Sequence, residues 1–503
     1  MSFQKVALIL GAGPAGLSAA CALIEQNIKP IIVETESVIG GLSRTLNYNG
    51  NIVDIGPHRF FTKEEKILNL WEKFLPKQGF PAKDDIQLKR DVSFFDGTSN
   101  PEIEDKSMLK RYKISRILYD KNFYDYPIKL NINTFKNLGL KDSLIAFSSY
   151  LKSCIFKSKE KSLQDFIINR YGKFLYKMFF ENHTQKVWGH HPQNIPQEWG
   201  VQRIKGISFV KDFFKNPLSL TDEYLYPKNG SSQLWDEMAQ HILNCGGEIH
   251  TNATVVGLKL ENKKIVSVQV NKENQTHDWY ADYIISSLPI KDLMEKMSSV
   301  PQSIKNVATN LAYRDYIMTT FLIKDFKIKN NTKYPTLNNI PPDSWIYTQQ
   351  RDVKVGRLYT PQSFSPYICD TKNTVVCLEY FCNENDELWN KSQEDFIKFS
   401  GEELKKIGII EDSSDILEAY QFKTKKAYPA HFGAYKDFDK IKDFINLIDN
   451  LYPIGRNGQH KYNNIDHSML SGILASEIIT KNLPKEYIWD VNTEKIYNEI
   501  KNN

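Results

Sequence analysis

The sequence predicts an α/β protein in which a repeated strand-and-helix pattern is interrupted by two inserts. Three observations predict this: a strand–glycine loop–helix–strand unit at the start, returning strand and helix patterns near residues 226 and 451, and alternating or β-branched runs between them. At 503 residues the chain is too long for one simple core, so two or three structural units are expected.

The first unit reads VALILGAGPAGLSAACALIEQNIKPIIVETE. Residues 6–10 and 31–33 are continuous apolar runs, as in buried parallel strands. Between them Gly11, Gly13 and Gly16 form the GxGxxG of a Rossmann-like site, where the backbone approaches a pyrophosphate at a helix N-terminus. Glu34 lies 18 residues beyond Gly16, where a carboxylate accepts hydrogen bonds from a ribose. This order favours a dinucleotide site over a plain glycine turn.

A second glycine segment, GGLSRT at residues 40–45, can carry a loop back across the pyrophosphate, with Arg44 near its charge. The combined pattern resembles the flavoproteins that include amine oxidases, protoporphyrinogen oxidase, phytoene desaturase and UDP-galactopyranose mutase. The resemblance implies one FAD, in preference to NAD. It also implies these cofactor-binding residues: Gly11, Gly13, Pro14, Ala15, Gly16, Glu34, Gly41, Leu42, Arg44, Gly56, Pro57, His58, Val255, Gly455, Arg456, Asn464 and Ile465.

The domain organisation follows from where these patterns return. We expect residues 1–95, 220–295 and 425–503 to form the FAD-binding domain. Residues 96–219 read as a helical substrate or lid domain, in which SLQDFIINRYGKFLYKMFFENHTQKVWG is the clearest amphipathic stretch. Residues 296–424 carry runs such as YIMTTFLI and NTVVCLEYFC, which predict an antiparallel-sheet substrate domain.

The stretch DIGPHRFF fixes the chain direction at Gly56 and Pro57 and presents His58 in one pose. In UDP-galactopyranose mutases a Gly-Pro-His-x-Phe loop lies against the isoalloxazine ring, and GPHRF is similar to it. The resemblance implies that His58 touches the flavin near its reactive face. The alternative is a histidine that caps a turn.

Further segments resemble the substrate pocket of the same mutases. HTQKVWG is similar to their Tyr-Thr-x-Lys-Gln-Trp-Gly, which implies Trp188 beside the sugar or flavin, although a core tryptophan is the competing interpretation. His183 stands where that family has a tyrosine stacked on uracil, so the base is left open. The resemblance further implies diphosphate contacts from Arg203, Arg314, Tyr347 and Tyr380, because Arg offers a planar donor fork and Tyr a neutral donor.

The implied function is a flavin-dependent isomerase, a nucleotide-sugar mutase that interconverts pyranose and furanose forms of a UDP-galactose-like sugar for surface polysaccharide synthesis. The reaction would have no net redox change and would pass through an adduct between the sugar and N5 of reduced FAD, with His58, Arg203 and Arg314 as catalytic residues. Such an enzyme needs an external reductant such as NAD(P)H or a reductase. The alternatives are an amine-oxidase-, protoporphyrinogen-oxidase- or desaturase-like oxidoreductase, and a flavin-fold binding protein without chemistry.

Composition excludes other classes. The formal charge of +5 is small and the lysines are interspersed with acids, so no nucleic-acid partner is expected. No apolar run approaches the ~18 residues of a membrane span, and six cysteines without a CxxC pair and a start without a secretory leader predict a cytoplasmic protein. His190 and His191 lack spaced metal-ligand partners, so no metal is expected, and no GxSxG elbow is present.

Overall fold

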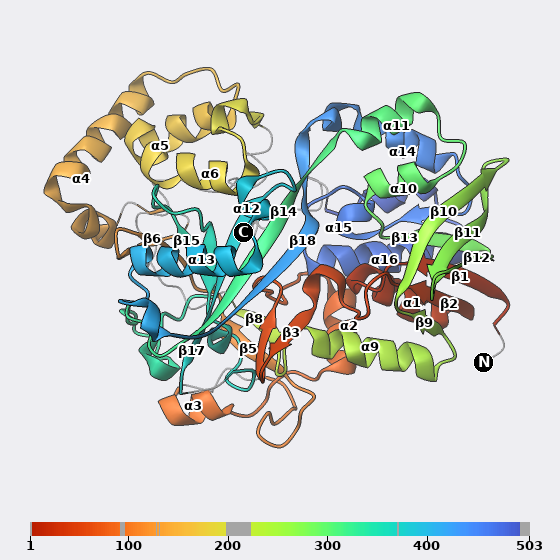
Figure 1. Cartoon of the computed structure of the whole chain (residues 1–503), viewed down its shortest axis with the longest axis horizontal. Helices are drawn as coiled ribbons and strands as arrows, with labels where there is room; N and C mark the ends of the chain where they lie inside the picture. The colour runs from red at the N-terminus through yellow and green to blue at the C-terminus, as the bar shows by residue number, and fades with distance from the viewer. Residues whose placement is uncertain are drawn as a thin grey trace.

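The structure, a computed structural model, describes residues 3–90, 96–126, 128–129, 131–197, 223–369 and 372–492. A parallel sheet with its helices forms one half of the molecule, and a larger, mainly antiparallel sheet forms the other (Figure 1). Helices α4, α5 and α6 cover one end of the larger sheet. The predicted α/β class, with a Rossmann-like domain and an antiparallel sheet, is confirmed.

The parallel sheet gathers strands from distant parts of the chain. Its order is β19-β13-β1-β2-β9, and every pair is parallel. The strands are β1 Lys5–Leu10, β2 Ile28–Val33, β9 Glu248–His250, β13 Tyr283–Ser286 and β19 Leu451–Pro453. Helix α1, Pro14–Ile24, packs against α9, Ser232–Asn244, and α16, Ile465–Lys481. A separate antiparallel sheet is formed by β10 Ala253–Glu261, β11 Lys264–Lys272 and β12 Gln275–Trp279.

The second large sheet has the order β18-β14-β17-β16-β15-β6-β7, and only the β15–β6 pair is parallel. Its strands are β6 Ser115–Tyr119, β7 Asn122–Asp125, β14 Leu311–Ile323, β15 Trp345–Thr348, β16 Arg357–Tyr359, β17 Thr374–Cys382 and β18 Ile416–Gly433. Alternation along β17 divides its side chains between two cores. Val376, Leu378 and Tyr380 pack toward α13, Gln393–Ile407, whereas Phe381 joins the core of the nucleotide-binding half.

The helical region consists of α4 Ile132–Ile155, α5 Leu163–Phe179 and α6 Glu181–Trp188, which share a third core. The remaining elements are β3 Thr45–Tyr48, β4 Asn51–Asp54, α2 Glu65–Phe74, α3 Lys83–Leu88, β5 Met108–Tyr112, β8 Glu223–Pro227, α10 Ile290–Lys296, α11 Gln302–Thr309, α12 Glu387–Asn390, α14 Phe438–Asn446 and α15 Gly455–Gly458. Within these ranges no helix combines the length and the hydropathy that crossing a bilayer would take.

Two expected domain boundaries differ from the strands observed. Residues 96–219 were expected to be mostly helical, yet they contain β5, β6 and β7, and β6 and β7 extend the large sheet. The reason is non-local: β6 is stabilised by pairing with β15, more than two hundred residues away. Strand β18 also runs through the expected boundary between residues 424 and 425.

The contact between α1 and α16 is unusually close because it is made by glycine. A Cβ added to Gly472 would lie 2.2 Å from the carbonyl oxygen of Ala15 and 3.0 Å from the amide nitrogen of Ala19. Beside it the Ser18 hydroxyl donates to the carbonyl of Met469 at 2.9 Å. Any side chain at position 472 must therefore push the two helices apart.

We predict that Gly472→Ala lowers the free energy of unfolding by about 1–3 kcal/mol, the usual cost of overpacking. Thermal unfolding followed by circular dichroism measures the change. Gly401→Ala in α13 is the matched control, because its Cβ meets only the terminal Cδ1 of Ile416 at 3.2 Å. The control should be neutral or stabilising by up to about 1 kcal/mol. Equal effects of the two substitutions would contradict the close-packing argument.

Candidate functional site

The glycines between β1 and α1 have two different roles. Gly11 has a φ of +109°, and an added Cβ would lie 2.2 Å from the Ser287 hydroxyl oxygen; one on Gly16 would lie 2.0 Å from the Gly11 carbonyl oxygen. Gly13 has an ordinary φ of −78°, and its added Cβ would meet only the Cα of Gly41, at 3.8 Å. Gly11 and Gly16 therefore serve the protein's own packing, whereas Gly13 leaves space at the N-terminus of α1.

That helix end is suited to an anion. No side chain caps α1 and no acidic residue lies in its first turn, so its first amides are available to a ligand. The Gly40 amide donates to the Ala12 carbonyl at 2.9 Å, which brings the segment 40–45 alongside. Arg44 adds a cation there: its Nε is enclosed without a hydrogen-bond partner, and its Nη2 is 3.5 Å from Glu36.

Glu34 follows β2 directly, as the fingerprint predicts. One carboxylate oxygen accepts the Ala12 amide at 2.8 Å and the other accepts the Glu36 amide at 3.0 Å. Each oxygen keeps a further lone pair, so a ribose hydroxyl can bind while the loop stays in place. Val255 is buried in β10, next to a bulge in the β10–β11 pairing. A nucleotide bound beside β10 would contact the main chain of Val255.

The C-terminal return closes this site from the other side. Gly455 has a φ of +74°, and its added Cβ would lie 3.1 Å from the Cβ of Ala15. Asn464 precedes α16 without capping it by its side chain, and the Asp466 carboxylate in the first turn accepts the amides of Asp466 and His467. Arg456 donates to the carbonyls of Asn463 and Ala427 and lies over the rings of two tyrosines, Tyr428 at 5.4 Å and Tyr462 at 5.0 Å.

The turn before His58 is anchored by the buried carboxylate of Asp54. That carboxylate accepts hydrogen bonds from the hydroxyls of Thr45, Tyr226 and Ser231 and from the Ser231 amide. His58 Nδ1 lies 3.6 Å from Asp54, so the ring is held near the anchor without a short hydrogen bond. The loop thus presents His58 from a rigid base.

The far side of this loop faces a second carboxylate. Gly56 has a φ of +79°, and an added Cβ would lie 3.1 Å from Oε1 of Glu379 and 3.4 Å from the hydroxyl of Tyr316. Tyr316 donates to Glu379 at 2.8 Å. Arg357 donates its Nε to the other oxygen of Glu379 and its Nη2 to Tyr428 at 3.0 Å. Glu379 is therefore fully engaged by Tyr316 and Arg357.

Arg59, the residue after His58, has no such partner. Its guanidinium lies 3.5 Å from the centre of the Trp345 ring, and its Nη1 is enclosed without a hydrogen bond. It pairs with no carboxylate among the described residues. Burial, with the neighbouring positive charge of Arg357, lowers the pKa of Arg59 to about 10, so it stays protonated at neutral pH. Arg59 and Arg357 both keep partial exposure, so a ligand can reach them.

Aromatic rings complete this cluster of five side chains, Arg59, His183, Trp345, Tyr347 and Arg357, which we call the chamber. Tyr347 stacks on Tyr126 with ring centres 4.0 Å apart, and His183 meets it edge-on at 5.3 Å. Burial, then the charges of Lys186 and Arg357, lowers the pKa of His183 to about 3, so its ring is neutral. Burial raises the pKa of Tyr347 well above its usual range, so its hydroxyl remains a donor.

Two of the predicted substrate residues that the structure describes, Arg314 and Tyr380, do not join the chamber. Arg314 donates Nε to the Val187 carbonyl at 3.1 Å and Nη2 to the carbonyls of Lys186 and Phe381 at 3.3 and 2.8 Å. The carbonyls at the end of α6 attract this guanidinium, as helix C-termini do, so the protein's own main chain holds Arg314, and its diphosphate contact stays a prediction. Tyr380 does not lie where it was expected: strand alternation turns it to the opposite face of β17, with its ring centre 5.0 Å from that of Phe396. Arg203 lies outside the described residues.

Trp188 is buried, with its ring centre 6.4 Å from that of Tyr462, in the core shared by the helical region. The main role of Trp188 in this structure is therefore packing within that core.

Sequence reasoning missed Arg59, Arg357 and Glu379. Arg59 stands inside the GPHRF motif itself, where a cation directly before an apolar run is a usable signal. Glu379 is the one acid in the nine residues of β17, TVVCLEYFC, and a charge in a buried strand requires a partner. Arg357 carries no comparable local signal, because only the pairing of β16 with β17 brings it to Glu379.

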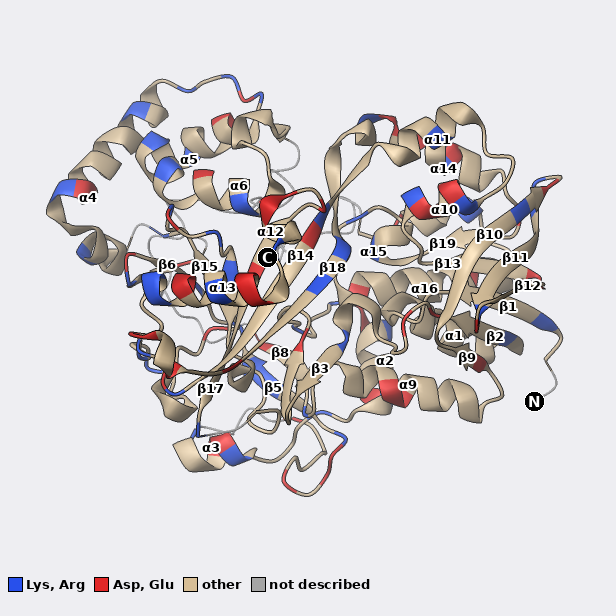
Figure 2. Ribbon diagram, viewed as in Figure 1, with Lys and Arg blue, Asp and Glu red and all other residues tan. Residues whose placement is uncertain are grey.

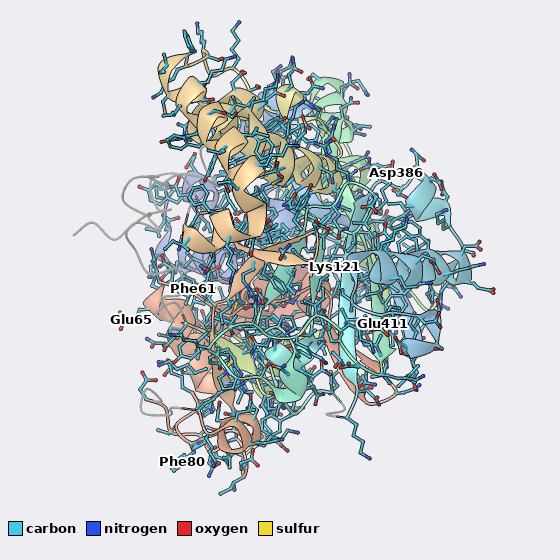
Figure 3. All side chains as sticks on the ribbon, turned by 90° about the vertical axis from the view of Figure 1, so that its left-hand side faces the viewer. Phe61, Glu65, Phe80, Lys121, Asp386 and Glu411 are labelled. Atoms are coloured by element: carbon cyan, nitrogen blue, oxygen red, sulfur yellow. The ribbon has the colours of Figure 1, made fainter. Side chains whose placement is uncertain are left out.

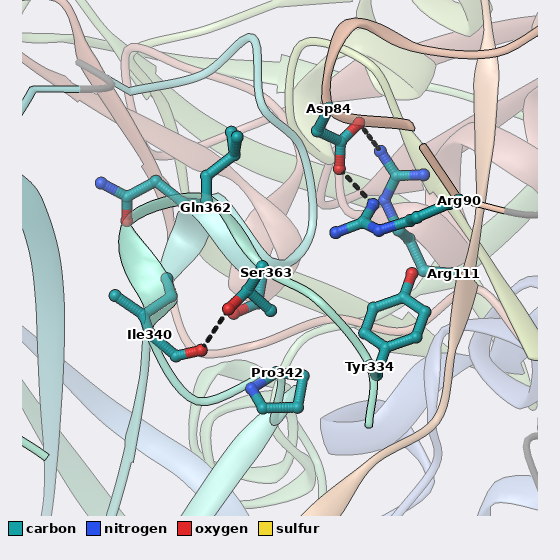
Figure 4. A pocket seen from close by; sticks show the side chains of 10 residues that line it. Asp84, Arg90, Arg111, Tyr334, Ile340, Pro342, Gln362 and Ser363 are labelled. Carbon is teal, nitrogen blue, oxygen red and sulfur yellow. Dashed lines mark hydrogen bonds and ion pairs between the residues drawn. The ribbon is translucent and has the colours of Figure 1, made fainter. Parts of the chain in front are cut away.

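A second group of buried charges differs from the chamber, because each arginine in it is paired with an acid. It surrounds a cavity of about 20 Å³, room for one water, beside Asp84, Arg90, Arg111 and Tyr334 (Figure 4). Asp84 contacts Arg90 at 2.5 Å and Arg111 at 3.3 Å, and Asp85 contacts Arg90 at 3.0 Å. Each arginine there has an acid, so this cluster joins segments of the fold and offers no free charge to a ligand.

Comparison with known proteins identifies the cofactor. Residues 14–320 match the profile of the flavin containing amine oxidoreductases. A dTDP-fucopyranose mutase of Escherichia coli is 26% identical over 287 residues, 55% of this chain and 63% of the mutase. A 4,4'-diapophytoene desaturase (4,4'-diapolycopene-forming) of Methylomonas sp is 25% identical over 295 residues, 52% of this chain and 50% of the desaturase. The chain thus spans between half and two thirds of the length of these relatives.

The fold comparison covers almost the whole chain. The structure of a reduced UDP-galactopyranose mutase superposes with a TM-score of 0.75 at 17% identity, over 97% of this chain and 99% of that one. It has the same fold. Together with the open space at Gly13, the free amides of α1 and the carboxylate of Glu34, these matches identify FAD as the cofactor.

We predict that Gly13→Val keeps the fold but reduces flavin affinity tenfold or more, because the added side chain occupies the pyrophosphate space and a loss of about 1.4 kcal/mol suffices. The ratio of flavin to protein absorbance measures retention, and circular dichroism checks the fold. Gly16→Ala is the contrasting variant, since its Cβ would strike the Gly11 carbonyl oxygen at 2.0 Å and damage the fold itself. A fully yellow Gly13→Val protein would place the pyrophosphate elsewhere.

Proposed function

The chain belongs to the flavin-containing amine oxidoreductases, and we propose that within this family it is a nucleotide-sugar mutase that interconverts pyranose and furanose forms on reduced FAD. One observation carries the proposal: Arg59 places a positive charge beside the His58 loop that has no carboxylate partner among the described residues. The chamber holds two guanidiniums, and the carboxylate of Glu379 beside it is already occupied by Arg357 and Tyr316. Its missing component is an anion.

The charge of the chamber discriminates between the substrate classes of the family. A protonated amine would add a second unpaired cation to a low-dielectric site, which is unfavourable. A polyene would leave Arg59 enclosed and unpaired, at the cost of its lost hydration. A nucleoside diphosphate supplies the missing negative charge and matches the planar donor fork of arginine. The mutase likeness therefore fits the chamber better than the desaturase likeness does.

The aromatic residues fit the remaining parts of such a ligand. His183 is neutral, and with Tyr126 and Tyr347 it offers uncharged aromatic rings that a base or sugar can pack against. The replacement of tyrosine by His183 leaves room for a base other than uracil, and the curated mutase relative acts on a dTDP-sugar. We propose a UDP- or dTDP-hexose as the substrate, with its furanose form used in surface polysaccharide.

The protein's own groups would orient the substrate and stabilise charge. Reduced FAD, when bound, supplies the nucleophile for the anomeric carbon, so an external reductant is needed but no acceptor is consumed. Arg59 and Arg357 would hold the diphosphate as its bond to the sugar breaks and its charge grows. The Tyr347 hydroxyl, kept protonated by burial, can donate to a phosphate oxygen. The anchored Asp54 turn would hold His58 at the flavin edge of the chamber.

We predict that the dithionite-reduced enzyme converts dTDP-fucopyranose or UDP-galactopyranose to the furanose, with many product molecules per flavin. Chromatography of the nucleotide sugars measures the conversion, and an oxygen electrode after reoxidation measures acceptor use. A mutase consumes no acceptor in proportion to product. Oxygen or quinone consumption matched to product, with an amine or a polyene as substrate, would instead establish an oxidase or desaturase.

We predict that Arg59→Ala weakens binding of free UDP and dTDP to the reduced enzyme by about tenfold to a hundredfold, the effect of losing a charge-assisted contact of about 1.5–3 kcal/mol. Titration calorimetry measures the affinity. Arg59→Lys should restore part of it, because the charge returns without the planar fork. Arg351→Ala is the matched control, as the Arg351 side chain is 66% exposed, and should bind normally. Unchanged affinity in Arg59→Ala would place the diphosphate elsewhere.

A further inference from the structure

Helix α4 presents large apolar side chains to solvent along one side. After a kink at Gly139, the apolar residues recur four, seven, eleven and fifteen positions beyond Leu140, which places them on one face of a helix. Their exposed fractions are large: Leu140 80%, Leu144 61%, Phe147 53%, Leu151 43% and Ile155 73%. We call these five residues the apolar stripe. Phe156, which follows the helix, is 71% exposed as well.

The apolar stripe does not serve to pack α4 against the protein, because α4 contacts the rest of the chain through its opposite side. Ala146 and Ser153 are buried there, and the Ser149 hydroxyl accepts the amide of Phe174 in α5 at 3.1 Å. A Cβ added to Gly172 in α5 would lie 2.8 Å from the main chain at Ser149, so the two helices approach closely. Small residues thus face the protein and large apolar ones face outward, the reverse of an ordinary surface helix.

Positive charge accompanies the stripe. Residues 132–161 contain six lysines and two acidic residues, a net charge of +4, whereas the whole chain carries +5. All six lysines are exposed: Lys136, Lys141, Lys152, Lys157, Lys159 and Lys161. Figure 2 shows blue segments along α4. Lys141 and Lys152 lie on the same flank of the stripe, and the last three follow the end of the helix.

The position of α4 leaves the stripe accessible. Among the described elements its extended contacts are with α5 and β7 only. The helix lies at the outer edge of the molecule in Figure 1, and it faces the viewer above Phe61 in Figure 3. A surface that combines an apolar stripe with lysines at its border has the two features that hold a helix in the plane of an anionic bilayer.

We propose that α4 is a docking surface for a membrane rich in anionic phospholipid. The stripe would lie among the upper acyl chains, and Lys141, Lys152 and the three lysines after the helix would contact phosphate groups. A second copy of the chain is the weaker occupant, because pairing two such faces would bring together two segments of charge +4. The proposal does not depend on the reaction, since it rests on α4 and its charges alone.

The test is flotation of the purified flavoprotein with lipid vesicles. We expect the protein to bind phosphatidylcholine vesicles that contain about a third phosphatidylglycerol, and to bind them more weakly in high salt. We expect little binding to phosphatidylcholine alone, because neither the apolar stripe nor the lysines suffice by themselves. Phe147→Ser combined with Leu151→Ser should lower the partition coefficient at least about tenfold while flavin absorbance is unchanged. Lys157→Gln combined with Lys159→Gln should lower it only for the anionic vesicles.

The matched control is Ile103→Ser combined with Leu447→Ser, two apolar residues that are 81% and 57% exposed elsewhere on the surface. This variant should bind vesicles as the parent protein does. Absence of binding to anionic vesicles at low salt, or equal loss in the control, would overturn the proposal. A dimer seen by light scattering that Phe147→Ser with Leu151→Ser converts to a monomer, without any vesicle binding, would assign the stripe to a second copy.

Discussion

The close approach of main chain at the N-terminus of α1 is the constraint on which the rest of the structure depends. Gly11, Gly16, Gly455 and Gly472 each stand where a side chain would strike a neighbouring loop or helix. The contacts of Gly455 and Gly472 join the first forty residues to the last fifty, so the nucleotide site exists only when both ends of the chain have folded. Both inserts leave and re-enter this scaffold. The scaffold also fixes the position of the His58 loop, which follows β4.

The substrate chamber depends on the same scaffold through Asp54. Its carboxylate collects donors from β3, β8 and the start of α9, and the Tyr359 hydroxyl donates to its main-chain carbonyl. The turn that follows therefore cannot shift without breaking several buried hydrogen bonds. Beyond it Glu379 neutralises Arg357, and Arg59 is left with an aromatic ring instead of an acid. Among the described residues the chamber thus keeps one guanidinium without an acidic partner, and the proposed anionic ligand would supply the opposite charge.

The sequence predicts the nucleotide-binding half more completely than the half that carries the chamber. The FAD fingerprint is local: strand, glycines, helix and Glu34 lie within thirty residues, so their spacing alone predicts the Rossmann-like unit. The chamber is built across the sheet, and a position shifted by one residue in β17 exchanges Glu379 for Tyr380. Arg314 was expected beside the diphosphate, but its surroundings depend on how α6 ends against β14 and β17. The strands β6 and β7 were missed because β6 is stabilised by its non-local pairing with β15, and β7 pairs in turn with β6. The outward stripe of α4 cannot be told from a buried face by periodicity alone.

The guanidinium of Arg314 donates to three main-chain carbonyls, and this bears on how an arginine at the same position in a related sequence is interpreted. They join the helical region to the large sheet through one side chain, so an arginine at this strand position contributes cohesion whatever the enzyme acts on. Such a residue can outlast a change of substrate during divergence. Its presence in a related sequence therefore says little about nucleotide sugars, and the residue after the histidine of the Gly-Pro-His loop is the more discriminating position to inspect.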